Sequence, residues 1–314
     1  MPDEPAEPAP EPGAERRCGF IAVIGAPNAG KSTLVNALVG AKVAIVSRKV
    51  QTTRATLRGI AVEGQSQLVF IDTPGIFAPR RRLDRAMVEA AWGGAVDADL
   101  VLLVIDAAKG VDDDVERILA KLAAAAGEQR KPPLLALNKI DRVRKEELLE
   151  LAARLNARIP FAATFMISAL DGDGVADLKA HLARSVPPGP WHYPADEVSD
   201  APLRVLAAEI TREKIYDRLH DELPYQSAVE TTAWREQGKS VRIEQTIYVE
   251  RDSQKAIVVG KGAAMIKQLS MEARRELSDL LERPVHLFLF VKVREGWGDD
   301  PARYRDLGLT FPKE

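Results

Sequence analysis

The sequence predicts an α/β domain, with a mostly parallel sheet covered by helices on both faces, followed by a smaller α+β domain. In residues 18–186, short continuous apolar runs alternate with longer segments whose apolar residues recur every three or four positions. Continuous apolar strands separated by helices are typical of a parallel sheet that is buried on both faces. After residue 201, strand patterns follow one another, and Val285–Val293 shows the period of two of a single strand.

Six strands and five helices are expected in the first domain. The strands are expected at Phe20–Ile24, Leu57–Val62, Leu68–Ile71, Leu100–Ile105, Leu134–Leu137 and Ala163–Ile167. The helices are expected at Lys31–Gly40, Asp84–Val96, Asp113–Ala125, Lys145–Ala157 and Val175–Arg184. Because the second strand ends only a few residues before the third begins, these two are expected to form an antiparallel hairpin at one edge of the sheet.

A proline-rich stretch marks the domain boundary. Residues 187–194 read PPGPWHYP, a composition that cannot continue a helix and favours an extended, stiff chain. We expect a disordered acidic, proline-rich tail at 1–17, a first domain at 18–186, a linker at 187–200 and a second domain at 201–314. The order expected in the second domain is a helix at 206–222, strands at 226–236 and 240–250, a glycine-containing turn, a helix at 263–281 and a strand at 285–294.

The composition excludes several classes of protein. Lys and Arg total 44 and Asp and Glu total 46, a formal charge of −2, so a nucleic-acid partner must be argued from local charge. The single cysteine, Cys18, excludes a disulfide framework and a thiolate metal cluster, and the four histidines lack the spacing of a zinc site. The longest apolar run of the expected strands, Leu100–Ile105, is far shorter than the ~20 residues of a membrane-spanning helix.

A glycine-rich loop lies directly after the first expected strand and directly before the first expected helix. It fits the pattern GxxxxGK[ST], in which backbone N–H groups at a helix N-terminus surround phosphates. Lys31 is expected to neutralise the β- and γ-phosphates, and Ser32 to bind Mg²⁺. The residues of the loop are Gly25, Ala26, Pro27, Asn28, Ala29, Gly30, Lys31 and Ser32.

Three further motifs each follow an expected strand. Asp72-Thr73-Pro74-Gly75 supplies an acid that can hold Mg²⁺ through water and a Gly75 N–H that can sense a γ-phosphate. Asn138-Lys139-Ile140-Asp141 places a carboxylate where it can accept the ring N–H and the amino group of guanine, two donors that adenine does not combine. Ser168-Ala169-Leu170 is expected to close the base pocket with a backbone N–H. The four motifs in this order predict GTP or GDP, rather than ATP, as the ligand.

The loop and the segment before the second strand resemble the Era family of translation-factor-like P-loop GTPases. The resemblance rests on Pro27-Asn28 and on Gln51-Thr52-Thr53-Arg54. The stretch Ser47–Arg54 and the linker at 187–200 are also similar to that family, and the resemblance covers about residues 18–314. It implies a slow GTPase with Mg²⁺ as cofactor, in which Thr53 reaches Mg²⁺ and the γ-phosphate, with Thr52 as the alternative.

The same resemblance implies a partner and a location. The second domain is expected to be a KH-type RNA-binding domain that binds the 3′ end of 16S rRNA, and the protein is expected to assist assembly of the 30S subunit. We further expect a monomer that binds no DNA, located in the cytoplasm with peripheral contact to the inner face of the cell membrane.

The residue after Gly75 departs from Ras-type GTPases. Ile76 stands where they carry a glutamine that orients the attacking water, and an isoleucine side chain cannot do this. The resemblance implies that Asn28 helps to hold a K⁺ beside the phosphates, and the alternative is an Asx turn that only stabilises the loop. The expected catalytic positions are Lys31, Thr53, Gly75 and Ile76, and the expected metal ligands are Ser32, Thr53 and Asp72.

A basic, glycine-rich segment of the second domain is the predicted RNA site. It resembles the GxxG loop of KH domains, which lets the backbone approach a sugar-phosphate strand, and the preceding Ile257–Val259 is expected to be a strand. Ala263 replaces the second glycine of the motif, where a positive φ would be strained. The expected RNA-binding residues are Gly260, Lys261, Gly262, Ala263, Lys267, Arg274 and Arg275. The alternative is a KH-like module that contacts protein without binding RNA.

Overall fold

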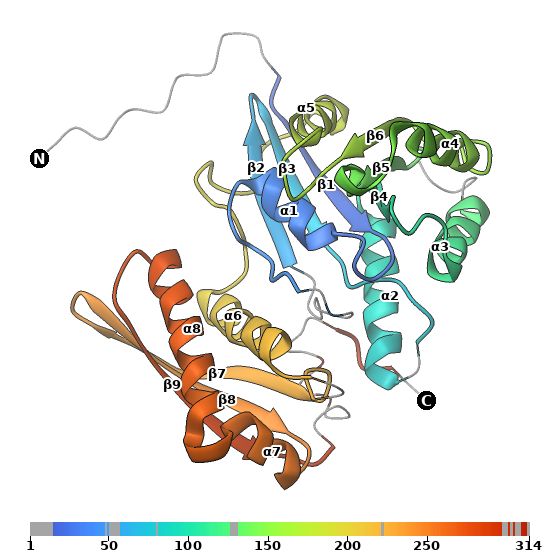
Figure 1. The fold of residues 1–314 in the computed structure, drawn as a ribbon. Coiled ribbons are helices and arrows are strands. Elements are labelled where there is room, and N and C mark those ends of the chain that lie inside the picture. The colour runs from blue at the N-terminus through green and yellow to red at the C-terminus, as the bar shows by residue number, and fades with distance from the viewer. Residues whose placement is uncertain are drawn as a thin grey trace, which may run out of the picture.

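The computed structural model of the chain describes residues 15–312, apart from 48, 50–56, 80, 126–130, 221–222, 297–300, 302–303 and 305–308. An N-terminal α/β domain lies above a smaller C-terminal domain in Figure 1. The strands of the first domain are β1 (Arg17–Ile24), β2 (Leu57–Glu63), β3 (Ser66–Asp72), β4 (Leu100–Asp106), β5 (Leu134–Asn138) and β6 (Thr164–Ile167). Its helices are α1 (Lys31–Val39), α2 (Arg82–Asp97), α3 (Asp113–Ala124), α4 (Lys145–Asn156) and α5 (Val175–Ser185), with a short 3-10 helix at Ile140–Arg142.

The first domain has the predicted doubly covered sheet. The strand order is β2-β3-β1-β4-β5-β6, and the strands run parallel except for β2, which pairs with β3 as the expected antiparallel edge hairpin. Helices α1 and α5 bury apolar side chains against one face, and α2, α3 and α4 against the other. Because parallel strands end at the same edge, the loops that follow β1, β3, β5 and β6 converge there.

The second domain is a three-stranded sheet covered on one face by helices. Its elements are α6 (Leu203–Arg218), β7 (Ser227–Gln237), β8 (Ser240–Val249), α7 (Asp252–Val259), a 3-10 turn (Lys261–Ala263), α8 (Ala264–Leu280) and β9 (Val285–Val293). β8 lies in the middle, antiparallel to β7 and parallel to β9. The two apolar clusters of this domain lie between the strands and the helices α6, α7 and α8. The predicted fold class is confirmed for both domains.

One predicted element of the second domain is wrong. The apolar residues before Gly260 belong to helix α7, not to a strand, and the Gly260 N–H donates to the Ala256 carbonyl over 2.9 Å, a helical i to i−4 bond. The side chain of Gln254 accepts the N–H of Arg251 (3.2 Å), which satisfies a donor at the start of this helix. Three consecutive apolar residues fit a buried strand and a short helix equally well, so hydropathy alone could not separate them.

The linker is packed against the first domain. The indole N–H of Trp191 donates to the carbonyl of Gln65 over 3.1 Å, in the turn between β2 and β3. The side-chain oxygen of Gln67 accepts the backbone N–H groups of His192 (2.8 Å) and Tyr193 (3.1 Å). These contacts attach residues of the predicted linker to the edge hairpin.

The last described residues of the chain return to the first domain. Tyr304 and Leu309 are buried against Ala86 and Met87 of α2. The label C lies beside one end of α2 in Figure 1. In the described part of the chain, no helix combines the length and apolar character needed to cross a membrane. The described residues also hold no cluster of three or more His, Cys, Asp or Glu that could bind a metal.

Candidate functional site

The four predicted motifs meet at the carboxyl edge of the parallel sheet. The phosphate loop joins β1 to α1, Asp72 and Asn138 end β3 and β5, and Ser168 follows β6. The pocket at this edge includes three residues after α1 that the motifs do not contain. Its lining consists of Pro27, Asn28, Gly30, Lys31, Ser32, Thr33, Ile45, Val46, Ser47 and Gly75.

Gly30 brings the phosphate loop into contact with the base-recognition motif. Its φ of 97° favours glycine, and a Cβ at this position would lie 2.2 Å from the side-chain nitrogen of Asn138. The Asn138 amide donates to the carbonyl of Ala29 (2.8 Å) and accepts the N–H of Ala169 (2.9 Å). One amide therefore fastens the phosphate loop to the loop after β6.

Lys31 is the buried cation of the phosphate loop. Its ammonium group donates to the carbonyls of Gly25 (3.1 Å) and Ala26 (3.0 Å) in its own loop. Burial lowers its pKa to about 8, although the carboxylate of Asp72 acts in the opposite direction. The arrangement holds the ammonium group where the β- and γ-phosphates are expected, and burial makes the Lys31 side chain easier to deprotonate than an exposed lysine.

Ser32 and Asp72 place two oxygens together below the phosphate loop. The Ser32 hydroxyl donates to Oδ2 of Asp72 over 2.8 Å, and the Asp72 side chain is fully buried. The hydroxyl of Thr73 donates to the carbonyl of Val23 (2.7 Å), which fixes the chain just after β3. Hydroxyl and carboxylate oxygens are ligands that suit Mg²⁺. Thr53 and its alternative Thr52 lie outside the described residues.

Gly75 and Ile76 contact the phosphate loop through the backbone. A Cβ on Gly75 would lie 2.9 Å from the Cα of Pro27, so a larger residue would push the two loops apart. The Ile76 N–H donates to the carbonyl of Gly25 (3.0 Å), while its side chain is buried in the apolar cluster that covers one face of the sheet. The Ile76 side chain therefore offers no group that can orient water.

The base-recognition residues are held by their neighbours. The Lys139 ammonium group contacts Asp106 (2.6 Å) and the carbonyl of Asn28 (2.7 Å), which lays the lysine across the space between β4 and the phosphate loop. The hydroxyl oxygen of Ser168 lies within hydrogen-bond distance of two carboxylates, Asp171 (2.8 Å) and Asp141 (3.0 Å), which brings the carboxylate expected to read guanine next to the loop after β6. Ile140 begins the short 3-10 helix that carries Asp141, and Leu170 is exposed.

The predicted RNA loop lies between α7 and α8, with Lys261 and Gly262 exposed. Three of its four residues have a positive φ: 73° at Gly260, 59° at Gly262 and 62° at Ala263. Ala263 thus adopts the conformation that its side chain disfavours.

The four predicted RNA-binding cations do not lie in one place. Lys267 is exposed in the first turn of α8, next to the loop, whereas Arg274 and Arg275 lie about two turns further along the helix, roughly 11 Å from Lys267. Arg275 lines a groove between α6 and α8 with several carboxylates. The residues of this groove are Lys214, Asp217, Arg218, Glu272, Arg275, Glu276 and Asp279.

Comparisons with known proteins match both domains. A family model described as 50S ribosome-binding GTPase matches residues 20–139, and a KH domain model matches residues 222–298. The GTPase Era of Bradyrhizobium sp. strain BTAi1 is 64% identical over 310 residues, which cover 98% of this chain and 99% of that protein. The GTPase Era of Afipia carboxidovorans is 62% identical over 315 residues, 100% of this chain and 99% of that protein.

The chain belongs to the Era family of GTPases. Two solved Era structures are each 35% identical to it, with a TM-score of 0.87, and cover 93% of this chain and 99% of their own. One is an Era variant of Aquifex aeolicus bound to GDP and AlF4⁻. The other is Era in complex with MgGDPNP and nucleotides 1506–1542 of 16S ribosomal RNA. The predicted Era resemblance is confirmed, and the chain is a GTPase.

Two sets of residues in this Era-family GTPase were not predicted. Asp106 holds Lys139, and its signal in the sequence is an acid that directly follows the apolar run of β4, the strand beside β5. Ile45, Val46 and Ser47 form a wall of the nucleotide pocket; Ser47 begins a stretch that resembles the Era family, but none of the three was expected to line the pocket. Within this wall, the Val46 N–H donates to Glu213 of the second domain over 2.8 Å, a contact that the sequence does not show.

Proposed function

We propose that this Era-family GTPase is a GTP-dependent switch that binds the single-stranded 3′ region of 16S rRNA through its KH domain and assists assembly of the 30S subunit. The observation that carries this proposal is the Gly260–Ala263 loop, which leads into α8 and carries Lys261 on its exposed part, with Lys267 exposed in the first turn of the helix. The Era structure that contains 16S rRNA supports the assignment of the RNA. The proposal places the protein in the cytoplasm as a monomer on the ribosomal subunit, with peripheral membrane contact as a further expectation.

We propose that the ligand of the pocket is GTP with Mg²⁺. The Ser32 hydroxyl and the Asp72 carboxylate would hold the ion directly or through water, and the phosphates of the nucleotide would complete its shell. When bound, the ion neutralises charge on the β- and γ-phosphates. Lys31 adds a second positive charge from the loop, and the Era structure with MgGDPNP supports this pairing of metal and nucleotide.

The proposed mechanism requires a cation in place of a glutamine or arginine. Because the Ile76 side chain is buried in the core, we expect intrinsic hydrolysis at or below ~10⁻² s⁻¹. K⁺ beside Asn28 should accelerate it relative to Na⁺, and Asn28→Ala should abolish the difference. Phosphate release measured in matched KCl and NaCl tests this. Equal rates in the two salts would favour the Asx turn as the role of Asn28.

RNA binding can be tested with the full-length protein and a single strand of the 16S 3′ end. Replacing Lys261 and Lys267 by Glu should weaken binding, because both lysines are expected to contact phosphates. The log–log salt slope, which is about −0.7 per contacted phosphate on a single strand, should become shallower. The matched control reverses two exposed charges on α4, Lys145→Glu with Arg154→Glu, and should leave binding unchanged.

The protein-contact module remains the competing function. It predicts no preference for the 16S strand over a scrambled strand, and no loss of affinity in the Lys261 and Lys267 variant. The acidic residues around Arg275 are the observation that favours it. Gel-shift titrations that gave both results would replace the RNA proposal with this alternative.

A further inference from the structure

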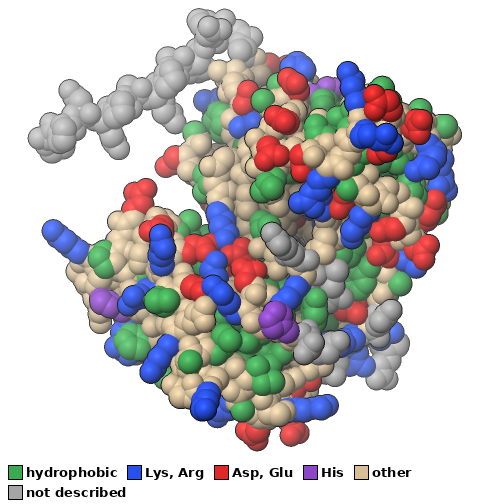
Figure 2. Space-filling model, viewed as in Figure 1, with side chains coloured by type: hydrophobic (Ala, Val, Ile, Leu, Met, Phe, Trp, Pro, Cys, Tyr) green, Lys and Arg blue, Asp and Glu red, His purple; other side chains and the backbone are tan. Residues whose placement is uncertain are grey.

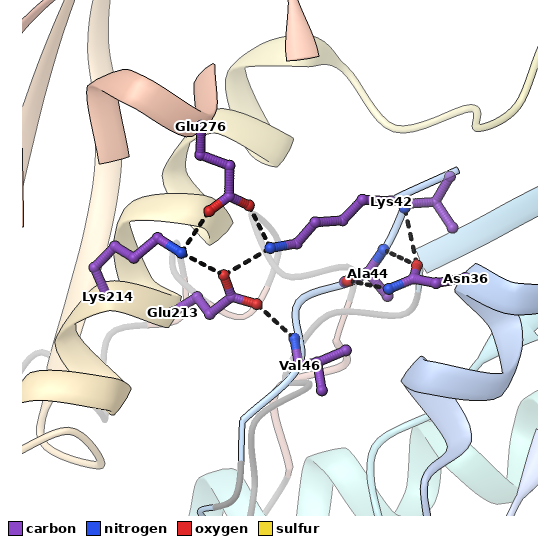
Figure 3. A network of polar contacts seen from close by, with 8 residues as sticks. Asn36, Lys42, Ala44, Val46, Glu213, Lys214 and Glu276 are labelled. Carbon is purple, nitrogen blue, oxygen red and sulfur yellow. Dashed lines mark hydrogen bonds and ion pairs between the residues drawn. The ribbon is translucent and has the colours of Figure 1, made fainter. Parts of the chain in front are cut away.

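Two acidic and two basic side chains form a closed network where the domains meet. Lys42 follows α1, whereas Glu213 and Lys214 belong to α6 and Glu276 to α8 (Figure 3). The ammonium groups of Lys42 and Lys214 lie 2.7 and 2.9 Å from the same oxygen of Glu213, and both also pair with Glu276. We call these four residues the interdomain network. Acidic and basic side chains gather at this junction in Figure 2.

Glu213 differs from Glu276 in the hydrogen bond made by its second carboxylate oxygen. That oxygen accepts the backbone N–H of Val46 over 2.8 Å, a contact from the KH domain to the first domain. The Glu213 side chain is 5% exposed, whereas that of Glu276 is 25% exposed. Burial alone would raise the pKa of the Glu213 carboxyl, but the hydrogen bonds from Lys42, Val46 and Lys214 outweigh it and keep the pKa below its ordinary value.

Val46 lies in the wall of the nucleotide pocket. The residues just before it are held by their own domain, because the side chain of Asn36 accepts the N–H groups of Val43 and Ala44, at 2.9 Å each, and donates to the Ala44 carbonyl (Figure 3). Val46 and Lys49 both contact the second domain: the Val46 N–H donates to Glu213, and the Lys49 ammonium group donates to the carbonyls of Tyr216 and Leu219 at the end of α6. The backbone N–H of Lys49 stays within its own segment and donates to the hydroxyl oxygen of Ser47 over 3.3 Å.

We propose that Glu213 is a positioning residue of the nucleotide site, supplied by the KH domain. Its carboxylate fixes the backbone at Val46 and so sets the wall formed by Ile45–Ser47, at the start of the segment that leads to Thr53. Through this contact the KH domain slows the escape of bound nucleotide. Lys42 and Lys214 keep the carboxylate charged and aimed at the Val46 N–H.

The network provides its own matched control. Glu276 pairs with the same two lysines, and replacing either glutamate by Ala removes one negative charge from the same cluster. Among the described residues, the Val46 N–H donates to Glu213 and not to Glu276. A role limited to joining the domains predicts equal effects of the two replacements, whereas the positioning role predicts unequal effects at the nucleotide site.

The test is the dissociation rate of a fluorescent GDP analogue from the full-length protein, measured with melting temperatures of the same variants. Glu213→Ala should release the analogue about tenfold faster, the change expected for loss of a hydrogen bond to a charged group. Glu276→Ala should change the dissociation rate less than about threefold. It should lower the melting temperature by about as much as Glu213→Ala does. Glu213→Gln keeps an oxygen for the Val46 N–H, so its rate should stay within about threefold of the parent protein.

Three results would overturn the proposal. Equal acceleration in Glu213→Ala and Glu276→Ala would reduce the network to a domain contact. An unchanged or slower release in Glu213→Ala would show that the wall is positioned by other groups. A rate for Glu213→Gln equal to that of Glu213→Ala would assign the effect to the ion pairs and not to the hydrogen bond at Val46.

Discussion

At the scale of single residues, the protonation of Lys31 depends on its burial in the phosphate loop. The pocket holds its pKa at about 8 through burial, below the ordinary value of a lysine, and its loop supplies two carbonyl acceptors. The nucleotide phosphates supply the negative charge that favours the protonated form. Binding and protonation at Lys31 are therefore coupled.

This coupling predicts a pH dependence of nucleotide affinity. Below pH 8 the lysine is already charged, and binding exchanges no proton at this group. Above pH 8 the free protein must take up a proton to bind, so the Kd for GDP should rise with pH, by at most about tenfold per unit. Calorimetry from pH 7 to 9 in buffers of different ionisation enthalpy measures both the Kd and the proton uptake. A Kd that is flat over this range would contradict the assignment.

At the scale of elements, the turn between α7 and α8 carries a conformation at odds with its sequence. Ala263 has φ 62° and ψ 24°, the left-handed region, directly before the first residue of α8. Such a conformation costs an L-residue about 1–2 kcal/mol relative to glycine, which adopts it freely. The strain lies at the predicted RNA loop, where the family motif places a glycine.

Ala263→Gly should therefore stabilise the KH domain. We expect the free energy of unfolding to rise by about 1 kcal/mol, because the left-handed strain is removed. The control is the neighbouring Ala264→Gly, where φ is −65° and the same change should destabilise α8 by about 0.5 kcal/mol. Denaturant titrations give both values. Effects of the same sign in the two variants would show that backbone strain at Ala263 is not the cause.

At the scale of the whole molecule, residues that follow β9 pack against helix α2 of the first domain. After β9, Tyr304 is buried against Ala86 and Met87 of α2, its ring lies 4.8 Å from that of Phe311, and Arg82 stacks on Phe311 at 5.2 Å. Helix α2 follows the segment that contains Gly75 and Ile76. The two domains are thus joined by the linker, by the interdomain network and by this aromatic contact.

Tyr304→Ala should destabilise the first domain although it lies near the end of the chain. Removing a buried aromatic side chain is expected to lower the free energy of unfolding by about 3 kcal/mol. Phe290→Ala is the control, because Phe290 is 47% exposed on β9 and its loss should change stability by less than about 1 kcal/mol. Thermal and denaturant unfolding compare the two. Similar losses would mean that the packing of Tyr304 on α2 contributes little.

The sequence alone determined the fold class, the strands and helices of the first domain to within a few residues, and the nucleotide motifs. These features are local: hydrophobic periodicity sets the elements, and each motif stands in its own strand-to-helix connection. The sequence-based prediction was wrong at α7. Three apolar residues such as Ile257–Val259 are too few to distinguish the period of a helix from that of a strand. The sequence left the positions of Arg274 and Arg275 relative to the loop undetermined.

Only the tertiary structure decided which distant groups meet. Lys42 and Glu213 are 171 positions apart in the sequence. No sequence pattern predicts that Asn36 bonds to Ala44 or that the Val46 N–H bonds to Glu213. Their contacts arise because α6 packs beside the chain that follows α1, and an isolated charge in a sequence carries no record of that packing. Residues of both domains therefore contribute contacts to the wall of the nucleotide pocket. The phosphate loop, in contrast, can be recognised from eight consecutive residues of the sequence.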